Sequence, residues 1–226
     1  MPRKRLLLKL SGEAFGQASP FSPERISRIS QRIASIDLEL AVVVGGGNIL
    51  RGARSDWLGR VDADELGMLA TVLNGLVLRS YLERAGRAAV VQSAVLTQFT
   101  EPISLRRAER ALTEGAVVIF TGGTGNPFVT TDTAAAIRAV MIGAELLAKA
   151  SNVPGVFTAD PNGGDEARLI PDLSYDEFLE KRYGVMDLAA VEICKEHGVP
   201  IAVFDFEEQD ALRRLAVGER VGTLIH

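Results

Sequence analysis

Cysteine and histidine are almost absent from this chain. Among 226 residues there is one cysteine, Cys194, and there are two histidines, His197 and His226. A single cysteine excludes an internal disulfide, and structural zinc sites need several cysteine or histidine ligands. We therefore expect neither a zinc cluster nor a Cys–His nucleophile pair, and we expect Cys194 to pack in the core.

The chain also lacks long apolar runs and a surplus of basic charge. The apolar run at 5–10 is too short for a signal peptide, and no stretch approaches the ~20 apolar residues of a membrane span. The formal net charge is −4, and outside the first five residues the basic side chains are scattered. This gives no general attraction for nucleic acid or anionic lipid. We expect a cytoplasmic protein that binds neither, in which any anion is held by a local site.

Linkers and internal repeats are missing as well. No stretch rich in proline, glycine or serine is long enough to separate two domains. With 47% hydrophobic residues, the chain is suited to one packed unit, so we predict a single domain over residues 1–226. Turn-forming residues are densest at 153–174, which we expect to be a surface excursion near a site.

Short apolar runs alternate with longer helical stretches, which predicts an α/β fold with a mostly parallel sheet covered by helices. The longest predicted helix covers 62–85, with Asp62 and Glu65 in capping-box spacing. Gly86, Gly115 and Gly198 follow helical runs as stop signals. The predicted strands are 5–10, 38–45, 87–92, 116–120, 145–150 and 200–204.

Three glycine-bearing turns, at 9–12, 42–52 and 119–128, follow predicted strands. In open α/β sheets, ligands bind beyond the carboxyl ends of the strands, where glycine lets backbone N–H groups approach phosphate oxygens. Any one of these could be only a tight turn, but three together favour a site for several phosphates. Neither G-x-x-x-x-G-K-[ST] nor G-x-G-x-x-G occurs, which excludes a P-loop enzyme and a typical Rossmann dehydrogenase.

Three charged residues adjoin these turns. Lys9 could be a solvated strand end, Arg51 a salt-bridged loop residue, and Asp132 a helix cap. The neighbouring glycines favour phosphate partners for Lys9 and Arg51, since an arginine fork suits bidentate oxygens. A helix cap at Asp132 would not require the glycine-rich stretch before it, so capping alone does not explain that stretch.

Six motifs occur in the order and spacing of a known family. The chain resembles the bacterial uridylate kinases of the amino acid kinase superfamily from residue 5 to residue 225, and GTGNPF-x-TTD is the most specific signal. The resemblance implies a three-layer sandwich with a mostly parallel central sheet, of the carbamate kinase-like type. The motifs are KLSGEAF (9–15), VVVGGGNILRG (42–52), ADELGMLATVLNGL (63–76), GTGNPFVTTDTAAAIRA (123–139), GVFTADP (155–161) and VMDLAA (185–190).

The resemblance implies a reaction and partners. ATP and UMP would give ADP and UDP, with Mg²⁺ carried mainly by the ATP phosphates and no protein ligand assigned to it. Members of this family are typically homohexamers that GTP commonly activates and UTP inhibits, so we expect a homohexamer with GTP and UTP as candidate effectors. The segment QASPFS (17–22) differs from a more glycine-rich run in some relatives, which argues against activation by GTP.

The resemblance also implies site residues. Lys9, Arg51 and Asp132 would be catalytic, with Asp132, or alternatively Asp187, orienting Lys9 or the metal's water shell, and Lys149 a second cation. Ser151 replaces the family's usual threonine, and VPG at 153–155 replaces VDG. The expected ATP contacts are Lys9, Leu10, Ser11, Gly12, Gly47, Arg51, Ser151, Phe157 and Asp160. The expected UMP contacts are Gly46, Asp64, Thr124, Gly125, Asn126, Pro127, Phe128, Val129, Thr130 and Thr131, with Asp64 on the ribose hydroxyls.

Two rival functions are open at this point. A kinase of the same superfamily could phosphorylate another acceptor, such as a carboxylate in the acetylglutamate kinases or a phosphate in the isopentenyl phosphate kinases. A protein of this fold could also sense nucleotides without turnover. The GTGNPF-x-TTD loop argues against the first, and Lys9, Arg51 and Asp132 together argue against the second.

Overall fold

The computed structural model describes residues 5–50, 57–159 and 167–226. Its main sheet has nine strands in the order β4-β3-β5-β2-β1-β6-β10-β11-β9, and all neighbours are parallel except β10 and β11. A separate antiparallel pair consists of β7 (Val156–Phe157) and β8 (Leu169–Ile170). The strands of the main sheet are β1 (Arg5–Leu10), β2 (Glu39–Val44), β3 (Ala89–Ser93), β4 (Glu101–Pro102), β5 (Val117–Thr121), β6 (Leu147–Ser151), β9 (Asp172–Leu173), β10 (Ile201–Asp205) and β11 (Thr223–Ile225).

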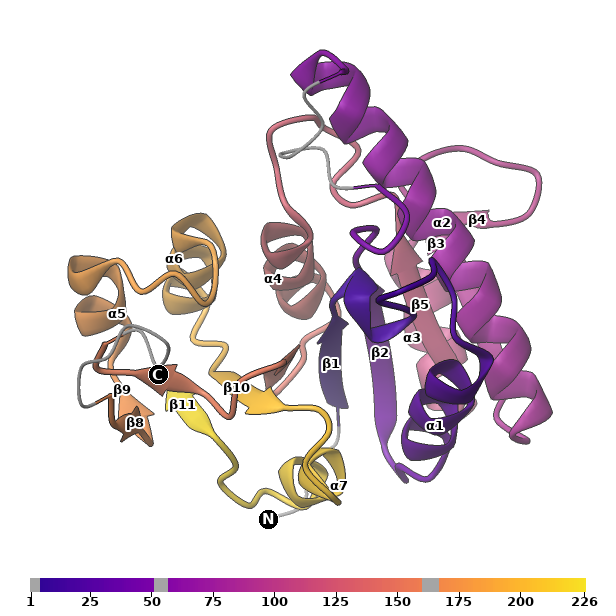
Figure 1. Cartoon of the computed structure of the whole chain (residues 1–226). Coiled ribbons are helices and arrows are strands. Elements are labelled where there is room, and N and C mark those ends of the chain that lie inside the picture. Colours follow the sequence, from indigo (N-terminus) through magenta and orange to yellow (C-terminus); the bar gives the residue numbers. More distant parts are fainter. Residues whose placement is uncertain (1–4, 51–56, 160–166) are drawn as a thin grey trace.

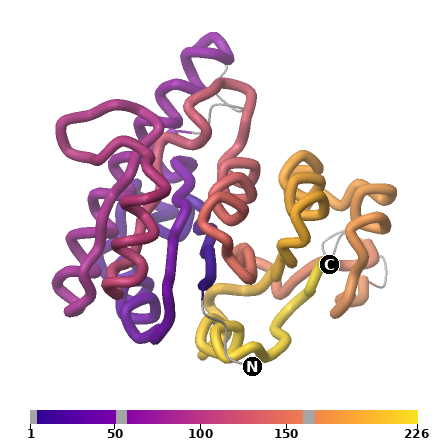
Figure 2. The backbone as a smooth tube through the Cα atoms, turned by 180° about the vertical axis from the view of Figure 1, so that it is seen from behind, coloured from indigo at the N-terminus to yellow at the C-terminus, as the bar shows by residue number. Residues whose placement is uncertain are grey.

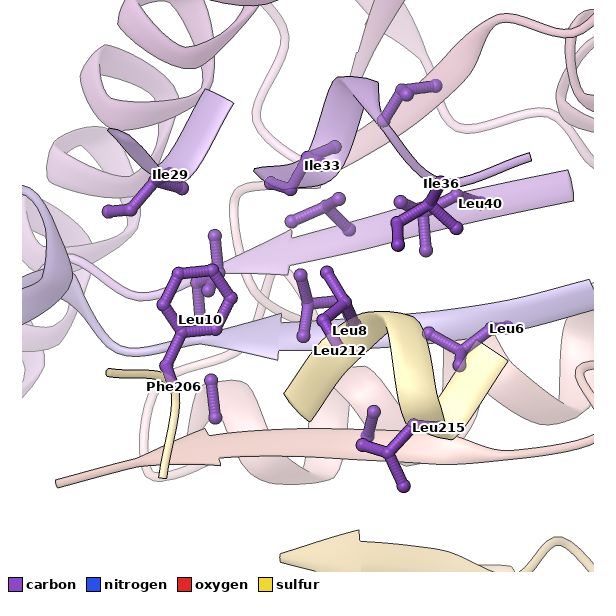
Figure 3. Close-up of a cluster of buried hydrophobic side chains, with 14 of the residues drawn as sticks. Leu6, Leu8, Leu10, Ile29, Ile33, Ile36, Leu40, Phe206, Leu212 and Leu215 are labelled. Atoms are coloured by element: carbon purple, nitrogen blue, oxygen red, sulfur yellow. The ribbon is translucent and has the colours of Figure 1, made fainter. Parts of the chain in front are cut away.

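The central strands form because their apolar side chains are buried on both faces of the sheet. Alternate residues of β1 point to opposite sides, so Leu6, Leu8 and Leu10 enter one hydrophobic cluster and Leu7 enters the other. Figure 3 shows the first cluster, in which Ile29 and other aliphatic side chains pack over these leucines. All six predicted strands are confirmed within two residues at each end.

Helices cover both faces and complete a three-layer sandwich (Figure 1). Seen from behind in Figure 2, the same helices again lie on either side of the sheet. On one face lie α1 (Pro23–Ala34), α2 (Arg60–Arg84) and α7 (Ala211–Ala216). On the other lie α3 (Leu105–Thr113), α4 (Thr131–Met141), α5 (Tyr175–Lys181) and α6 (Leu188–Glu196), with the buried Cys194 in this second cluster as predicted.

The helix ends follow most of the predicted signals. Gly86, Gly115 and Gly198 have φ of 82°, 83° and 65°, the left-handed conformation that ends a helix. The predicted cap of the longest helix was wrong, because α2 begins at Arg60 with Gly59 as its N-cap. Asp62 lies in the first turn instead, where its carboxylate still favours the positive end of the helix dipole.

Candidate active site

A buried cluster of three charged residues lies where β1 and β6 end. Lys9 and Lys149 are register partners on these strands, and Asp132 lies in the first turn of α4. Lys9 Nζ lies 2.6 Å from Asp132 Oδ1, and Lys149 Nζ donates to Oδ2 of the same carboxylate. Lys9 is only 8% exposed, Lys149 9% and Asp132 7%. Lys9 is therefore not a solvated strand end.

The charges of the cluster act on one another and favour the ionised form of Asp132. Burial alone would raise the pKa of Asp132, but Lys9 and Lys149 outweigh it and leave this pKa lowered. Burial and the charge of Lys9 lower the pKa of Lys149, against the attraction of Asp132. With both lysines protonated, the cluster has one net positive charge and suits an anion.

The helix-cap interpretation of Asp132 is wrong. Thr130 caps α4, because its Oγ1 accepts from the backbone N–H of Asp132 at 3.1 Å. Thr130 in turn donates to Asp187, whose carboxylate also accepts from Thr133 at 3.5 Å. Asp187 thus contacts the threonines at the start of α4, and its charge acts to raise the pKa of Lys149. Its alternative role, to orient Lys9 or the metal's water shell, stays a prediction.

A cavity of about 990 Å³ opens above the cluster. It brings together four of the residues predicted to bind ATP: Lys9, Ser11, Ser151 and Phe157. Residues 151–153 and 155–159 also line it, so the segment predicted as a surface excursion does border a site. Leu10 is fully buried in the core, so its side chain does not face this cavity.

The first two glycine turns pack against each other beside this cavity. A Cβ on Gly12 would collide with the backbone nitrogen of Gly47 and lie 2.7 Å from Asn48 Oδ1. The N–H of Gly45 donates to the carbonyl of Leu10 at 2.8 Å. Glycine is therefore required at position 12 for close backbone packing, and neither Gly12 nor Gly47 is among the residues that line the cavity.

A second cavity, of about 180 Å³, lies between α2 and the loop that leads into α4. Asp64 Oδ2 accepts from the backbone N–H of Phe128 at 2.8 Å and from Arg60 Nε at 2.9 Å, which ties the loop to the helix. Phe128 is 65% exposed and has φ of 66°, an unusual conformation for a residue other than glycine. Six of the predicted UMP contacts line this cavity: Gly46, Asp64, Asn126, Val129, Thr130 and Thr131. Thr124, Gly125, Pro127 and Phe128 belong to the same loop but lie outside the lining.

Several lining residues were missed by sequence reasoning. Lys181, the last residue of α5, and the two residues after it, Arg182 and Tyr183, contribute to the large cavity. Thr71 lines the small one, and nearby Asn74 is fully buried. The sequence did indicate Thr71 and Asn74, because they are polar residues that interrupt the apolar stretch ATVLNGL within a predicted helix.

Two predicted residues, Arg51 and Asp160, lie outside the described residues, and their roles stay predictions. Within the described ranges, no group of three or more histidine, cysteine or acidic side chains could hold a metal ion. No helix in the described part of the chain is both long enough and apolar enough to cross a membrane.

Comparison with known proteins assigns the chain to a family. Residues 4–205 match the sequence model of the amino acid kinase family. The chain belongs to this family. It is 46% identical to uridylate kinases of Magnetococcus marinus and Marinobacter nauticus, over 98% of this chain and 95% of each relative. The resemblance stated from the motifs is therefore confirmed.

Solved structures support the same assignment. The crystal structure of UMP kinase from Bacillus anthracis superposes with a TM-score of 0.95 at 37% identity, over 100% of this chain and 97% of that one. UMP kinase from Ureaplasma parvum gives 0.92 at 29% identity, over 100% and 99% of the two chains. The α/β fold predicted from the sequence is thus the amino acid kinase fold.

Proposed function

We propose that this chain transfers the γ-phosphoryl group of ATP to the phosphate of UMP, giving ADP and UDP. It is a uridylate kinase by close homology over nearly its full length. The observation that supports this chemistry most directly is the buried Lys9–Asp132–Lys149 cluster at the base of the large cavity. A net positive charge at that position can neutralise charge that develops on a transferring phosphoryl group.

We assign the large cavity to ATP. Ser11, Ser151 and Phe157 line it together with Lys9 and Lys149. In this assignment Lys9 contacts the transferred phosphoryl group, Lys149 supplies a second cation, and Asp132 positions both ammonium groups. Arg51 would complete the phosphate clamp, and Asp160 would contact the adenine nucleotide.

We assign the small cavity and its loop to UMP. Residues 124–131 would surround its phosphate and uracil, and the N-terminus of α4 adds a favourable field for the phosphate. Asp64 already accepts from Phe128 and Arg60, and a carboxylate has further acceptor positions for ribose hydroxyls. The reaction needs no covalent intermediate, because an oxygen of the UMP phosphate attacks the γ-phosphorus directly.

Mg²⁺ fits this site as an ion that arrives with ATP. Both carboxylate oxygens of Asp132 form ion pairs with lysines, so this carboxylate contacts lysines directly and not a metal ion. Mg²⁺ usually keeps several waters and binds through substrate phosphates plus one or two carboxylates. We therefore propose that ATP phosphates are its main ligands, where it would neutralise phosphate charge.

We further propose that the chain is a single domain that self-associates, as expected for a homohexamer. The continuous nine-stranded sheet supports one domain. Leu66, Leu69 and Leu73 are exposed at helical spacing along α2. Leu96 and Phe99, in the loop after β3, are exposed as well. Exposed apolar patches are typical of protein interfaces. Activation by GTP, inhibition by UTP and a cytoplasmic location stay predictions.

An assay of ADP release tests the proposed function. Purified protein with ATP and Mg²⁺ is offered UMP, CMP, dUMP, acetylglutamate and isopentenyl phosphate, with and without GTP. We expect turnover with UMP and little with the two non-nucleotide acceptors. Protein that binds ATP and UMP but releases no ADP would instead be a nucleotide sensor.

A further inference from the structure

Helix α2 contacts the turns beside both cavities through polar side chains on one of its faces. Asp64, Thr71 and Asn74 are separated by seven and three residues, so they lie along one side of the helix. Thr71 and Asn74 are buried, Asn74 completely. Buried polar groups in a helix are costly unless hydrogen-bonded, so their partners indicate why they are there.

Asn74 holds the second glycine turn, which packs on Gly12 beside the large cavity and lines the small cavity with Gly46. Its Nδ2 donates to the carbonyl of Gly45 at 2.6 Å and to Asn48 Oδ1 at 2.7 Å. Asn48 returns a hydrogen bond to Asn74 Oδ1 at 3.0 Å and also donates to the carbonyl of Pro20 at 2.6 Å. Because this turn packs directly on Gly12, Asn74 indirectly supports the turn that follows Lys9.

On the UMP side, Thr71 holds the third glycine turn. Its Oγ1 accepts from the backbone N–H of Gly122 at 2.7 Å and donates to the carbonyl of Met68 at 2.7 Å. Gly122 has φ of 74°, and it leads into the loop that lines the small cavity. The same loop is tied to α2 a second time by Asp64 and Phe128.

Two glycines bring the helix and the turns into close contact. A Cβ on Gly46 would lie 2.6 Å from the carbonyl oxygen of Gly67 in α2. A Cβ on Gly75 of α2 would collide with the side chain of Thr121 at the end of β5. Neither turn can shift toward the helix, and the hydrogen bonds oppose movement away from it.

We propose that α2 sets the separation between the second glycine turn, which packs on Gly12 and borders the small cavity at Gly46, and the third glycine turn, with Asn74 as the positioning residue for 45–48 and Thr71 for 121–123. This inference rests on the proposed function, because it assumes that the two cavities hold the two nucleotides. Phosphoryl transfer requires the attacking oxygen close to and in line with the γ-phosphorus, and small displacements of the reactants slow such reactions severely. One helix that binds both turns fixes that distance before the substrates bind.

Separate binding and rate measurements test this role. The variants are Asn74→Leu, Asn48→Ala, Thr71→Val and the conservative Thr71→Ser, with Ser80→Ala further along α2 as control. Calorimetry gives Kd for UMP and for a non-hydrolysable ATP analogue, and kcat is measured with both substrates saturating. Thermal unfolding shows whether each variant is folded, and Asn48→Ala replaces Asn74→Leu if the latter does not fold.

We expect Asn74→Leu and Asn48→Ala to weaken binding of the ATP analogue by roughly tenfold, because a typical buried hydrogen bond is lost where this turn packs on Gly12. They should weaken UMP binding by less, because Gly46 is the only residue of 45–48 that lines the small cavity. Thr71→Val should weaken UMP binding alone, and Thr71→Ser should restore it. All variants except Thr71→Ser and Ser80→Ala should lose kcat. Equal weakening of both nucleotides, or a lower Tm with both Kd values unchanged, would overturn the proposal. A wild-type protein that binds both nucleotides without forming UDP would contradict the proposed function instead.

Discussion

At the scale of single residues, the site is organised around one buried carboxylate. Asp132 pairs with Lys9 and Lys149, which come from neighbouring parallel strands. Sequence reasoning could select Lys9 and Asp132 because each adjoins a glycine-rich turn. It named Lys149 as a second cation only through the resemblance, because the pairing of β1 with β6 is a contact between segments far apart in the chain.

The first prediction concerns Lys9. Lys9→Ala should lower kcat by about a hundredfold or more, because a preorganised positive group that stabilises transition-state charge is lost. Lys195→Ala, which removes an exposed lysine paired with Asp176, is the matched control and should keep normal kcat. Steady-state UDP formation measures both. Near-normal kcat in folded Lys9→Ala would remove Lys9 from the catalytic site.

The second prediction concerns the pH dependence of stability. Asp132→Asn leaves two buried lysines without a counter-charge and should lower the free energy of unfolding at pH 7 by about 3 kcal/mol. The difference in unfolding free energy between Asp132→Asn and the wild type should shrink as pH rises toward the lowered pKa of Lys149, because that lysine then loses its charge. It should also shrink in acid, as pH falls through the lowered pKa of Asp132 in the wild type. Urea unfolding across pH measures this, and a constant difference would contradict it.

At the scale of elements, the buried strands were predictable and the short ones were not. The six apolar runs carry their own signal, since strands buried on both faces are continuously hydrophobic. The strands β4, β7, β8 and β9 have two residues each, and β11 has three, so no periodicity marks them. They are defined by pairing with distant partners, such as Leu224 opposite Asp172.

The role of α2 also emerges only from the structure. Its length and position were predicted, but its side chains contact turns 29 and 51 residues away, which no local pattern specifies. Apart from Gly123, the residues that line the small cavity from the loop were predicted through the resemblance. Their partners on α2, apart from Asp64, were not.

The third prediction concerns Asp64, which joins α2 to the UMP loop. Asp64→Asn removes a charged acceptor from Phe128 and Arg60, so KM for UMP should rise by about tenfold while KM for ATP stays unchanged. Asp62→Asn, an exposed acidic residue earlier in the same helix, is the control and should leave both constants unchanged. A change confined to ATP would place Asp64 in the other half of the site.

At the scale of the whole molecule, the parallel sheet places two cavities on either side of one glycine-rich edge. The larger lies over β6 and the segment after it, and the smaller lies between α2 and the loop after β5. The lysines of the cluster line the larger one. This arrangement suits a reaction that brings two polyanions together, because their repulsion must be offset where they meet.

The fourth prediction is the most direct test of phosphoryl transfer to UMP. Phosphorus NMR follows purified protein with ATP, Mg²⁺ and either UMP or uridine. We expect ADP and UDP to form in equal amounts with UMP. Uridine should give no product, because it lacks both the charged group that the loop would hold and the oxygen that attacks. Bound ATP and UMP with no UDP signal, or phosphorylation of uridine at a comparable rate, would contradict the account.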